Sequence, residues 1–160
     1  MIKKKFTVND FALQAMIAAV YVAITYIAYP LSFGSPQIRI SEFMLILIFF
    51  NPKHSIGLLV GCAIANFLGE FAIIDMFFGT MASAIAIFLM LKTKNQLLAF
   101  LWPAIINGVI IGLELHFLIG LPLFLTMGEV FIGEFLATFV PAMFLLKPLK
   151  ENPTLRRLFA

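Results

Sequence analysis

Residues 97–119 read LLAFLWPAIINGVIIGLELHFLI, and this stretch decides the class of fold. It is long enough to cross the hydrocarbon core of a bilayer as one helix, which takes about 20 residues. Glu114 is the only Asp, Glu, Lys or Arg within it. A helix of this length and composition is typical of a membrane span rather than of a water-soluble core.

The rest of the chain has the same character. Of its 160 residues, 62% are hydrophobic and 12% are charged, whereas ordinary globular chains are about half apolar and about a quarter charged. A chain this short cannot hide so much apolar surface inside a water-facing shell. We therefore expect an all-α integral membrane protein in the lipid bilayer, with a single transmembrane domain that covers residues 1–160.

Five further apolar segments flank this stretch, so the sequence predicts a compact bundle of about six transmembrane helices. They lie at residues 10–29, 38–51, 54–72, 76–91 and 122–146. Segments 10–29, 54–72 and 122–146 are long enough to cross a bilayer, and 76–91 is slightly short. Segment 38–51 is too short to cross alone, so we expect it to be tilted or shielded by its neighbours.

The basic residues predict the orientation of this bundle. With the amino terminus inside and six crossings, every Lys and Arg except Arg39 lies on the cytoplasmic side. These residues are Lys3, Lys4, Lys5, Lys53, Lys92, Lys94, Lys147, Lys150, Arg156 and Arg157. The bias follows the positive-inside rule. Both termini are therefore predicted to be cytoplasmic.

The acidic residues show the opposite asymmetry. In the same topology, the outer half and the outer loops hold Glu42, Glu70, Asp75, Glu114, Glu129 and Glu134, accompanied by Asn66 and His116, with Asn107 nearer the middle. A carboxylate at membrane depth costs about 3 kcal/mol or more unless it faces water, a partner or a cavity. The pattern therefore predicts a polar binding cavity that opens to the outside and is roofed by the loop 30–39.

Small residues recur at helical spacing in three of the segments. The stripes are Ala12, Ala15, Ala19 and Ala23, then Gly57, Gly61, Ala65 and Gly69, and finally Ala104, Gly108 and Gly112. Such stripes let two helices pack closely in lipid. We expect the second and third stripes to pack inside this chain, whereas the first could pack inside or receive another subunit.

Motifs for several other functions are absent. The sequence has no GxxxxGK[ST], HExxH or GxSxG motif, so P-loop, zinc-protease and α/β-hydrolase chemistry are not indicated. It has one cysteine and two histidines, too few for a disulfide or a typical metal site. A polar cavity that opens to the outside indicates first a binding site, and we expect no enzymatic activity, cofactor, metal ion or nucleic-acid partner. A self-sufficient carrier or channel with proton-relaying carboxylates, and a membrane enzyme with paired glutamates, are the alternatives.

Three stretches resemble a known family. They read YPLSFGSPQIRISE at residues 29–42, GCAIAN at 61–66 and DMFFGT at 75–80. Together with the first alanine stripe, they are similar to the QueT family, substrate-binding (S) components of energy-coupling factor (ECF) transporters. The resemblance implies uptake of queuosine precursors, chiefly the deazaguanine base preQ1, across the bacterial plasma membrane. It also implies a transmembrane coupling protein, two cytoplasmic ATPases and a toppling motion that carries the ligand inside.

The implied ligand suggests roles for the polar and aromatic residues. One carboxylate can accept hydrogen bonds from the ring N–H and the exocyclic amine of a deazaguanine. A second can neutralise the aminomethyl cation, and an aromatic ring can stack on the base. The candidates for ligand contact are Glu129, Glu134, Glu70, Asn66, Asn107 and Glu114, with Phe33, Phe77 and Phe78 for stacking.

Two further pairs of residues receive roles, the first from their spacing of three residues and the second from the first alanine stripe. Arg39 and Glu42 form either a local ion pair that anchors the loop, or a lid in which Arg39 holds a pocket carboxylate. Ala15 and Ala19 are the candidates for contact with the coupling protein. An S component for another vitamin or nucleobase-like micronutrient, or a self-sufficient proton-coupled carrier, is the alternative function.

Overall fold

The structure of the protein is a computed structural model that describes residues 6–34 and 36–159. Lys3, Lys4 and Lys5, which carry part of the predicted positive-inside bias, and Ser35 of the predicted roof lie outside the described residues. The elements in the described part are helical: α1 (Val8–Ile27), α2 (Tyr29–Phe33), η1 (Ile40–Phe49), α3 (His54–Phe67), α4 (Ile73–Lys92), α5 (Gln96–Ala99), α6 (Leu101–Ile119), α7 (Leu123–Glu151) and α8 (Pro153–Phe159).

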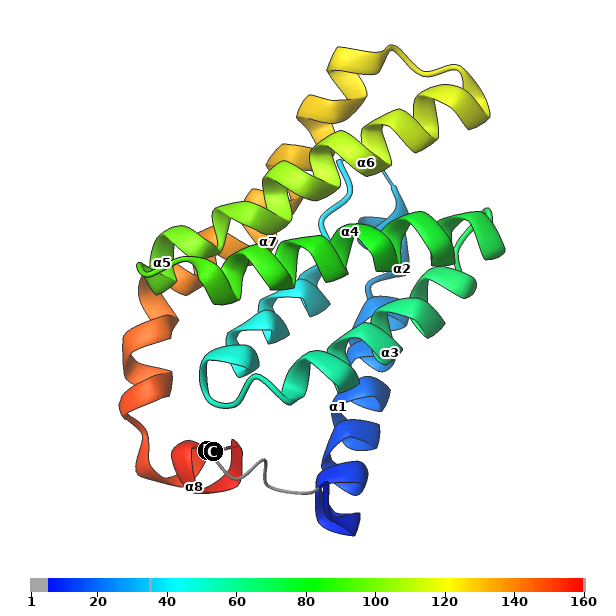
Figure 1. Cartoon of the computed structure of the whole chain (residues 1–160). Helices are drawn as coiled ribbons and strands as arrows, with labels where there is room; N and C mark the ends of the chain where they lie inside the picture. The colour runs from blue at the N-terminus through cyan, green and yellow to red at the C-terminus, as the bar shows by residue number, and fades with distance from the viewer. Residues whose placement is uncertain (1–5, 35, 160) are drawn as a thin grey trace.

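Four helices are long and apolar enough to cross a membrane. They are α1, α4, the α5–α6 unit over Gln96–Ile119, and α7. The predicted segments 10–29, 76–91, 97–119 and 122–146 are thereby confirmed as candidate spans. Figure 1 shows α6 and α7 side by side as a hairpin, with α3 and α1 on the other side of α4.

Segment 54–72 is shorter than predicted, because α3 has 14 residues and ends at Phe67. The chain then turns sharply before α4. The Asp75 carboxylate accepts a hydrogen bond from the Phe71 N–H at 3.0 Å, and Ala72 adopts a φ of 45°. This positive φ is rare for a residue with a side chain, and it marks the point where the chain reverses.

The short apolar element η1 lies inside the bundle. It is a 3₁₀ helix of 10 residues that packs against α1, α3, α4 and α7. In a 3₁₀ helix, residues three apart lie above one another. Glu42, Leu45 and Ile48 follow this spacing, and each is only 1% exposed. The prediction that this segment is shielded by its neighbours is therefore confirmed.

The three small-residue stripes have different surroundings. A Cβ atom on Gly61 would lie 2.9 Å from the Tyr21 Cβ, and one on Gly112 would lie 2.9 Å from the Met127 Cα. These glycines allow the close packing of α3 on α1 and of α6 on α7, as predicted. The α1 stripe, in contrast, is exposed on the outside of the bundle at Ala12, Ala15, Ala19 and Ala23.

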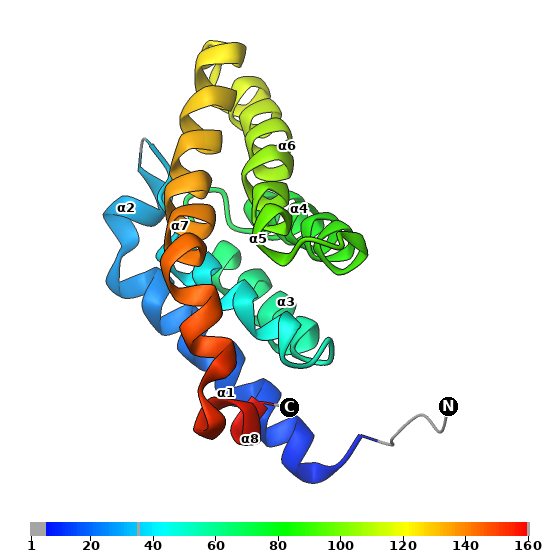
Figure 2. The same cartoon turned by 90° about the vertical axis from the view of Figure 1, so that its left-hand side faces the viewer.

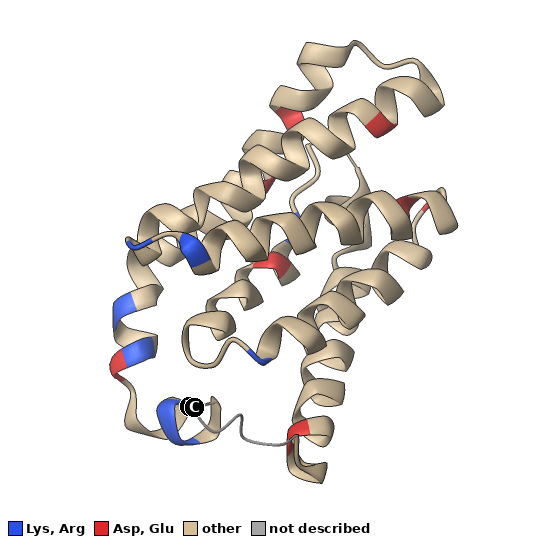
Figure 3. Ribbon diagram, in the orientation of Figure 1, with Lys and Arg blue, Asp and Glu red and all other residues tan. Residues whose placement is uncertain are grey.

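The ends of the bundle differ in charge. Figure 3 shows Lys and Arg gathered at the ends of α4 and α7, at α8 and before α3. Most acidic residues of α4, α6 and α7 lie toward the other end. Figure 2 shows α8 folded back near the beginning of α1, at the basic end.

Candidate functional site

Polar side chains from three helices, and from the residue that precedes η1, are buried in the interior of this apolar bundle. We define the central polar cluster as five buried residues: Arg39 before η1, Glu42 on η1, Asn107 and Glu114 on α6, and Glu134 on α7. Glu134 is 2% exposed and Arg39 is 4% exposed. Charged residues are almost never buried this deeply unless they are paired, so the cluster needs an explanation.

Each residue of the central polar cluster has a buried polar atom without a hydrogen-bond partner. Among the described residues, such atoms are Arg39 Nε, Glu42 Oε2, Asn107 Oδ1, Glu114 Oε1 and Glu134 Oε2, together with Thr80 Oγ1 on α4. Nearly all buried polar groups in folded proteins are paired with protein or water. The set contains both donor and acceptor atoms without a protein partner, and such atoms can pair with water or with a polar ligand.

Contacts from α1 hold part of this cluster in place. The Tyr21 hydroxyl donates a hydrogen bond to Oε1 of Glu42. The Thr25 and Ser41 hydroxyls lie 2.6 Å apart and join α1 to the start of η1. The Asn107 amide is oriented by its own helix, because its Nδ2 donates to the Pro103 carbonyl at 3.0 Å. The unpaired oxygens of Glu42 and Asn107 are therefore fixed in position.

Arg39 does not form the predicted local ion pair with Glu42. In the described part of the chain, the ion pair joins Lys53 and Asp10 at 3.3 Å. The Arg39 guanidinium instead lies over the Phe33 ring, 5.5 Å from its centroid, in a cation–π geometry. Tyr21 contacts one carboxylate oxygen of Glu42 instead, and the alternative in which Arg39 holds a pocket carboxylate as part of a lid stays a prediction.

Two adjoining cavities lie beside this cluster. The smaller, of about 30 Å³, is lined by Arg39, Asn66, Glu70, Asp75 and Glu114, among others. The larger, of about 160 Å³, is lined by Glu129, Thr126 and Glu70, among others. Phe33, Gln37, Glu70 and Leu115 line both. A small molecule entering the larger cavity would therefore meet carboxylates from α7 and from the turn after α3, and Glu114 of α6 lines the adjoining smaller cavity.

The loop predicted as a roof borders both cavities. Phe33 and Gln37 line each of them, and the Ile38 N–H donates to the Leu31 carbonyl at 2.8 Å. The Gln37 carbonyl lies where a Cβ atom on Gly133 would stand. Gly133 is thus the residue of α7 that lets this loop lie directly against the helix.

The predicted contact residues fall into two groups. Asn66 and Glu114 line the smaller cavity, Glu129 lines the larger, and Glu70 lines both. Glu42, Asn107 and Glu134 are buried and line neither cavity. Phe78 lies elsewhere: it is 37% exposed and lines an apolar groove of about 410 Å³ between α4 and α6. Among the proposed stacking rings, Phe33 is the one that borders the polar cavities.

Sequence reasoning missed two residues that shape the site, Tyr21 and Gln37. A signal for Tyr21 was present, because Gln14, Tyr21 and Thr25 are seven and four residues apart and so share one face of α1. That polar face is buried. Gln37 lies two residues before Arg39 in the stretch that resembles the family.

The described residues form an all-helical bundle with four helices of membrane-spanning length and a polar interior cavity, which is the architecture of a multi-pass membrane protein. The comparisons with known proteins narrow this class. The model of the QueT transporter family matches residues 11–151. The chain is also 32% identical to the queuosine precursor transporter QueT of Lactococcus lactis subsp. cremoris (strain MG1363) over 170 residues, covering 96% of this chain and 99% of that protein.

The chain therefore belongs to the QueT transporter family. No solved structure matches it.

Proposed function

We propose that this chain is the substrate-binding subunit of an ECF-type importer. In this function it captures a preQ1-like deazaguanine from outside and delivers it by toppling in the membrane against a coupling protein. The observation that carries the proposal is the set of unpaired buried atoms on Arg39, Glu42, Asn107, Glu114 and Glu134. A guanine-like base presents both donors and acceptors along its edges, so it can satisfy such a mixed set.

In this proposal, each carboxylate binds a different group of the ligand. Glu134, deep in the bundle and with Oε2 unpaired, accepts from the ring N–H and the exocyclic amine. Glu129 lines the larger cavity and neutralises the aminomethyl cation. Arg39 donates to the ring carbonyl from its place over Phe33, and Phe33 stacks on the base. The cavities then widen or rearrange around the ligand as it enters.

The proposed topology has six crossings and both termini in the cytoplasm. The separation of charge in Figure 3 supports this orientation, because basic residues favour the cytoplasmic side. Although η1 and α3 have 10 and 14 residues, each runs between the basic and acidic ends of the bundle (Figure 1). We infer that both cross, with η1 shielded from lipid by its neighbours.

Cysteine labelling in intact cells tests this topology. Pro36, Pro52 and Lys94 are exposed, and we expect Pro36→Cys to react with an impermeant thiol reagent added outside. Pro52→Cys and Lys94→Cys should react only after the membrane is opened. The unmodified chain is the control, because Cys62 is buried. Labelling of Pro52→Cys from outside would show that η1 and α3 re-enter on the same side, and would contradict six crossings.

The coupling protein and two cytoplasmic ATPases are the proposed partners. The chain has no P-loop motif, so in this proposal other subunits hydrolyse the ATP. The exposed alanines of α1 support a docking surface, because Ala15 and Ala19 lie on its outer side near the middle of the helix. Small residues allow a partner helix to approach closely in lipid.

A further inference from the structure

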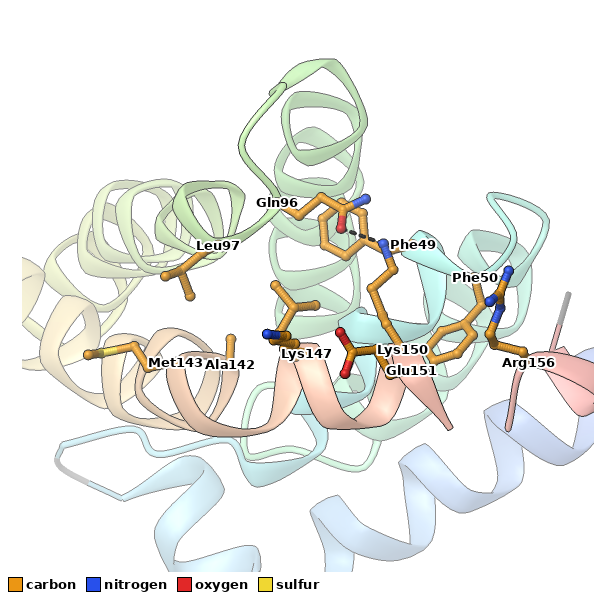
Figure 4. Close-up of a pocket in the computed structure, with 11 residues that line it drawn as sticks. Phe49, Phe50, Gln96, Leu97, Ala142, Met143, Lys147, Lys150, Glu151 and Arg156 are labelled. Atoms are coloured by element: carbon orange, nitrogen blue, oxygen red, sulfur yellow. Dashed lines mark hydrogen bonds between the residues drawn. The ribbon is translucent and has the colours of Figure 1, made fainter. Parts of the chain in front are cut away.

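A second groove lies at the basic end of the bundle, away from the polar cavities (Figure 4). Its volume is about 670 Å³, larger than either polar cavity. It is built where α7 ends, between the end of η1, the short helix α5 and α8. Nothing in the proposed transport cycle requires it.

Positive charge gathers in this groove. Lys147, Lys150 and Arg156 line it, against one acidic residue, Glu151. Lys150 Nζ donates to Gln96 Oε1 at 2.5 Å. Within residues 6–34 and 36–159, the side chains of Lys147 and Arg156 form neither a hydrogen bond nor an ion pair. Two cations are thus available to an anion, and a third is held beside them.

The walls of the groove are apolar. Phe49, Phe50, Leu97, Met143 and Leu146 line it. Met143 belongs to an exposed apolar surface of α7 that continues with Phe144 and Leu145. This surface lies in a candidate membrane span, so it faces lipid chains. The groove therefore joins a hydrocarbon-facing wall to a cationic rim.

Contacts at the carboxyl end hold Arg156 at this rim. His54 Nε2 donates a hydrogen bond to the Phe159 carbonyl at 2.8 Å, and Gln14 Nε2 donates to His54 Nδ1 at 3.1 Å. The Phe159 ring also packs against Phe50, with centroids 6.1 Å apart. These contacts hold α8 against α1, α3 and the end of η1. Arg156 of α8 lines the groove together with residues from the end of α7.

We propose that this groove binds an anionic phospholipid from the surrounding leaflet. The lipid phosphate lies between Lys147, Lys150 and Arg156, and one acyl chain runs along Phe49, Leu146 and Met143. Basic pockets between membrane helices favour anionic headgroups. A soluble anion would use the cations but leave the apolar wall empty, whereas a phospholipid matches both.

Native mass spectrometry of the purified full chain tests this site with phosphatidylglycerol and phosphatidylcholine as probes. We expect the chain to retain phosphatidylglycerol at least about tenfold better, since each Lys or Arg near an anionic lipid strengthens binding roughly fivefold. The triple change Lys147→Gln, Lys150→Gln and Arg156→Gln should remove this preference. A control with the same loss of charge, Lys92→Gln, Lys94→Gln and Arg157→Gln, should keep it, because none of its residues lines the groove.

Several outcomes would overturn the proposal. Equal retention of the two lipids by the unmodified chain would do so, as would an equal loss in the control variant. Displacement of phosphatidylglycerol by millimolar inorganic phosphate would assign the site to a free anion. If the unmodified chain shows no lipid preference and the groove variant no longer assembles with the coupling protein, the groove binds a protein partner. If the groove variant fails to fold, the unmodified chain is tested at raised salt instead. Salt should weaken its retention of phosphatidylglycerol but not of phosphatidylcholine.

Discussion

Replacing Glu134 with glutamine is expected to weaken the binding of preQ1 by the isolated chain roughly ten- to a hundredfold. Glu134 is 2% exposed and its Oε2 has no hydrogen-bond partner among the described residues. This oxygen can therefore accept a hydrogen bond from an N–H group of the ligand. Glutamine keeps the shape but removes the charge and one acceptor. Hydrogen bonds to charged groups are worth about 1.5–3 kcal/mol, which corresponds to this range of affinity.

The ligand series separates Glu134 from Glu129. Glu134→Gln should weaken preQ1 and its neutral nitrile analogue alike, because both carry the guanine-like edge. Glu129→Gln should weaken preQ1 far more than the nitrile, because only preQ1 carries the aminomethyl cation. Calorimetry on the purified variants measures both, with Glu151→Gln at the basic end as the control. Unchanged affinity in both variants would show that these glutamates do not contact the ligand.

Replacing Ala15 and Ala19 together with leucine is expected to abolish uptake while leaving ligand binding by the isolated chain intact. Both alanines are exposed on the outside of the bundle, so two larger side chains fit without disturbing the interior. They would hold a partner helix away from α1, where close approach depends on small residues. Uptake into cells and calorimetry on the purified variant give the two readouts.

Ala84→Leu on α4 is the control for the double variant. Ala84 is partly exposed, and a leucine at this position adds a larger side chain on a helix other than α1. Uptake should survive this change. Normal uptake by the Ala15→Leu, Ala19→Leu variant would remove α1 from the coupling interface, whereas loss of ligand binding would mean that the stripe supports the bundle itself.

The candidate spans could be predicted from the sequence because length and apolar composition dictate them. Residues 97–119 illustrate this, since a single carboxylate interrupts the run. The turn after Phe67 could not be predicted, because it depends on Asp75 reaching back to the Phe71 N–H. The helical type of η1 was also hidden, since residues 43–49 are all apolar and their packing against four neighbouring helices leaves no contrast between a buried and an exposed face.

The candidate site was predicted by residue type and depth but not by contact. Six acidic residues at one end indicated a polar interior, and Glu42, Glu114 and Glu134 do lie inside. Their partners depend on three-dimensional packing: Tyr21 is 21 residues from Glu42 along the chain. The same holds for the aromatic residues, because only the fold brings Phe33 to the cavities and puts Phe78 on a separate apolar groove.

Reconstitution into liposomes tests the central claim most directly. The purified chain alone should bind preQ1 but should not carry it across the membrane, with or without a proton gradient. Addition of the coupling protein, the two ATPases and MgATP should then start uptake. Uptake by the chain alone, driven by a proton gradient, would contradict the account and would make this protein a self-sufficient carrier.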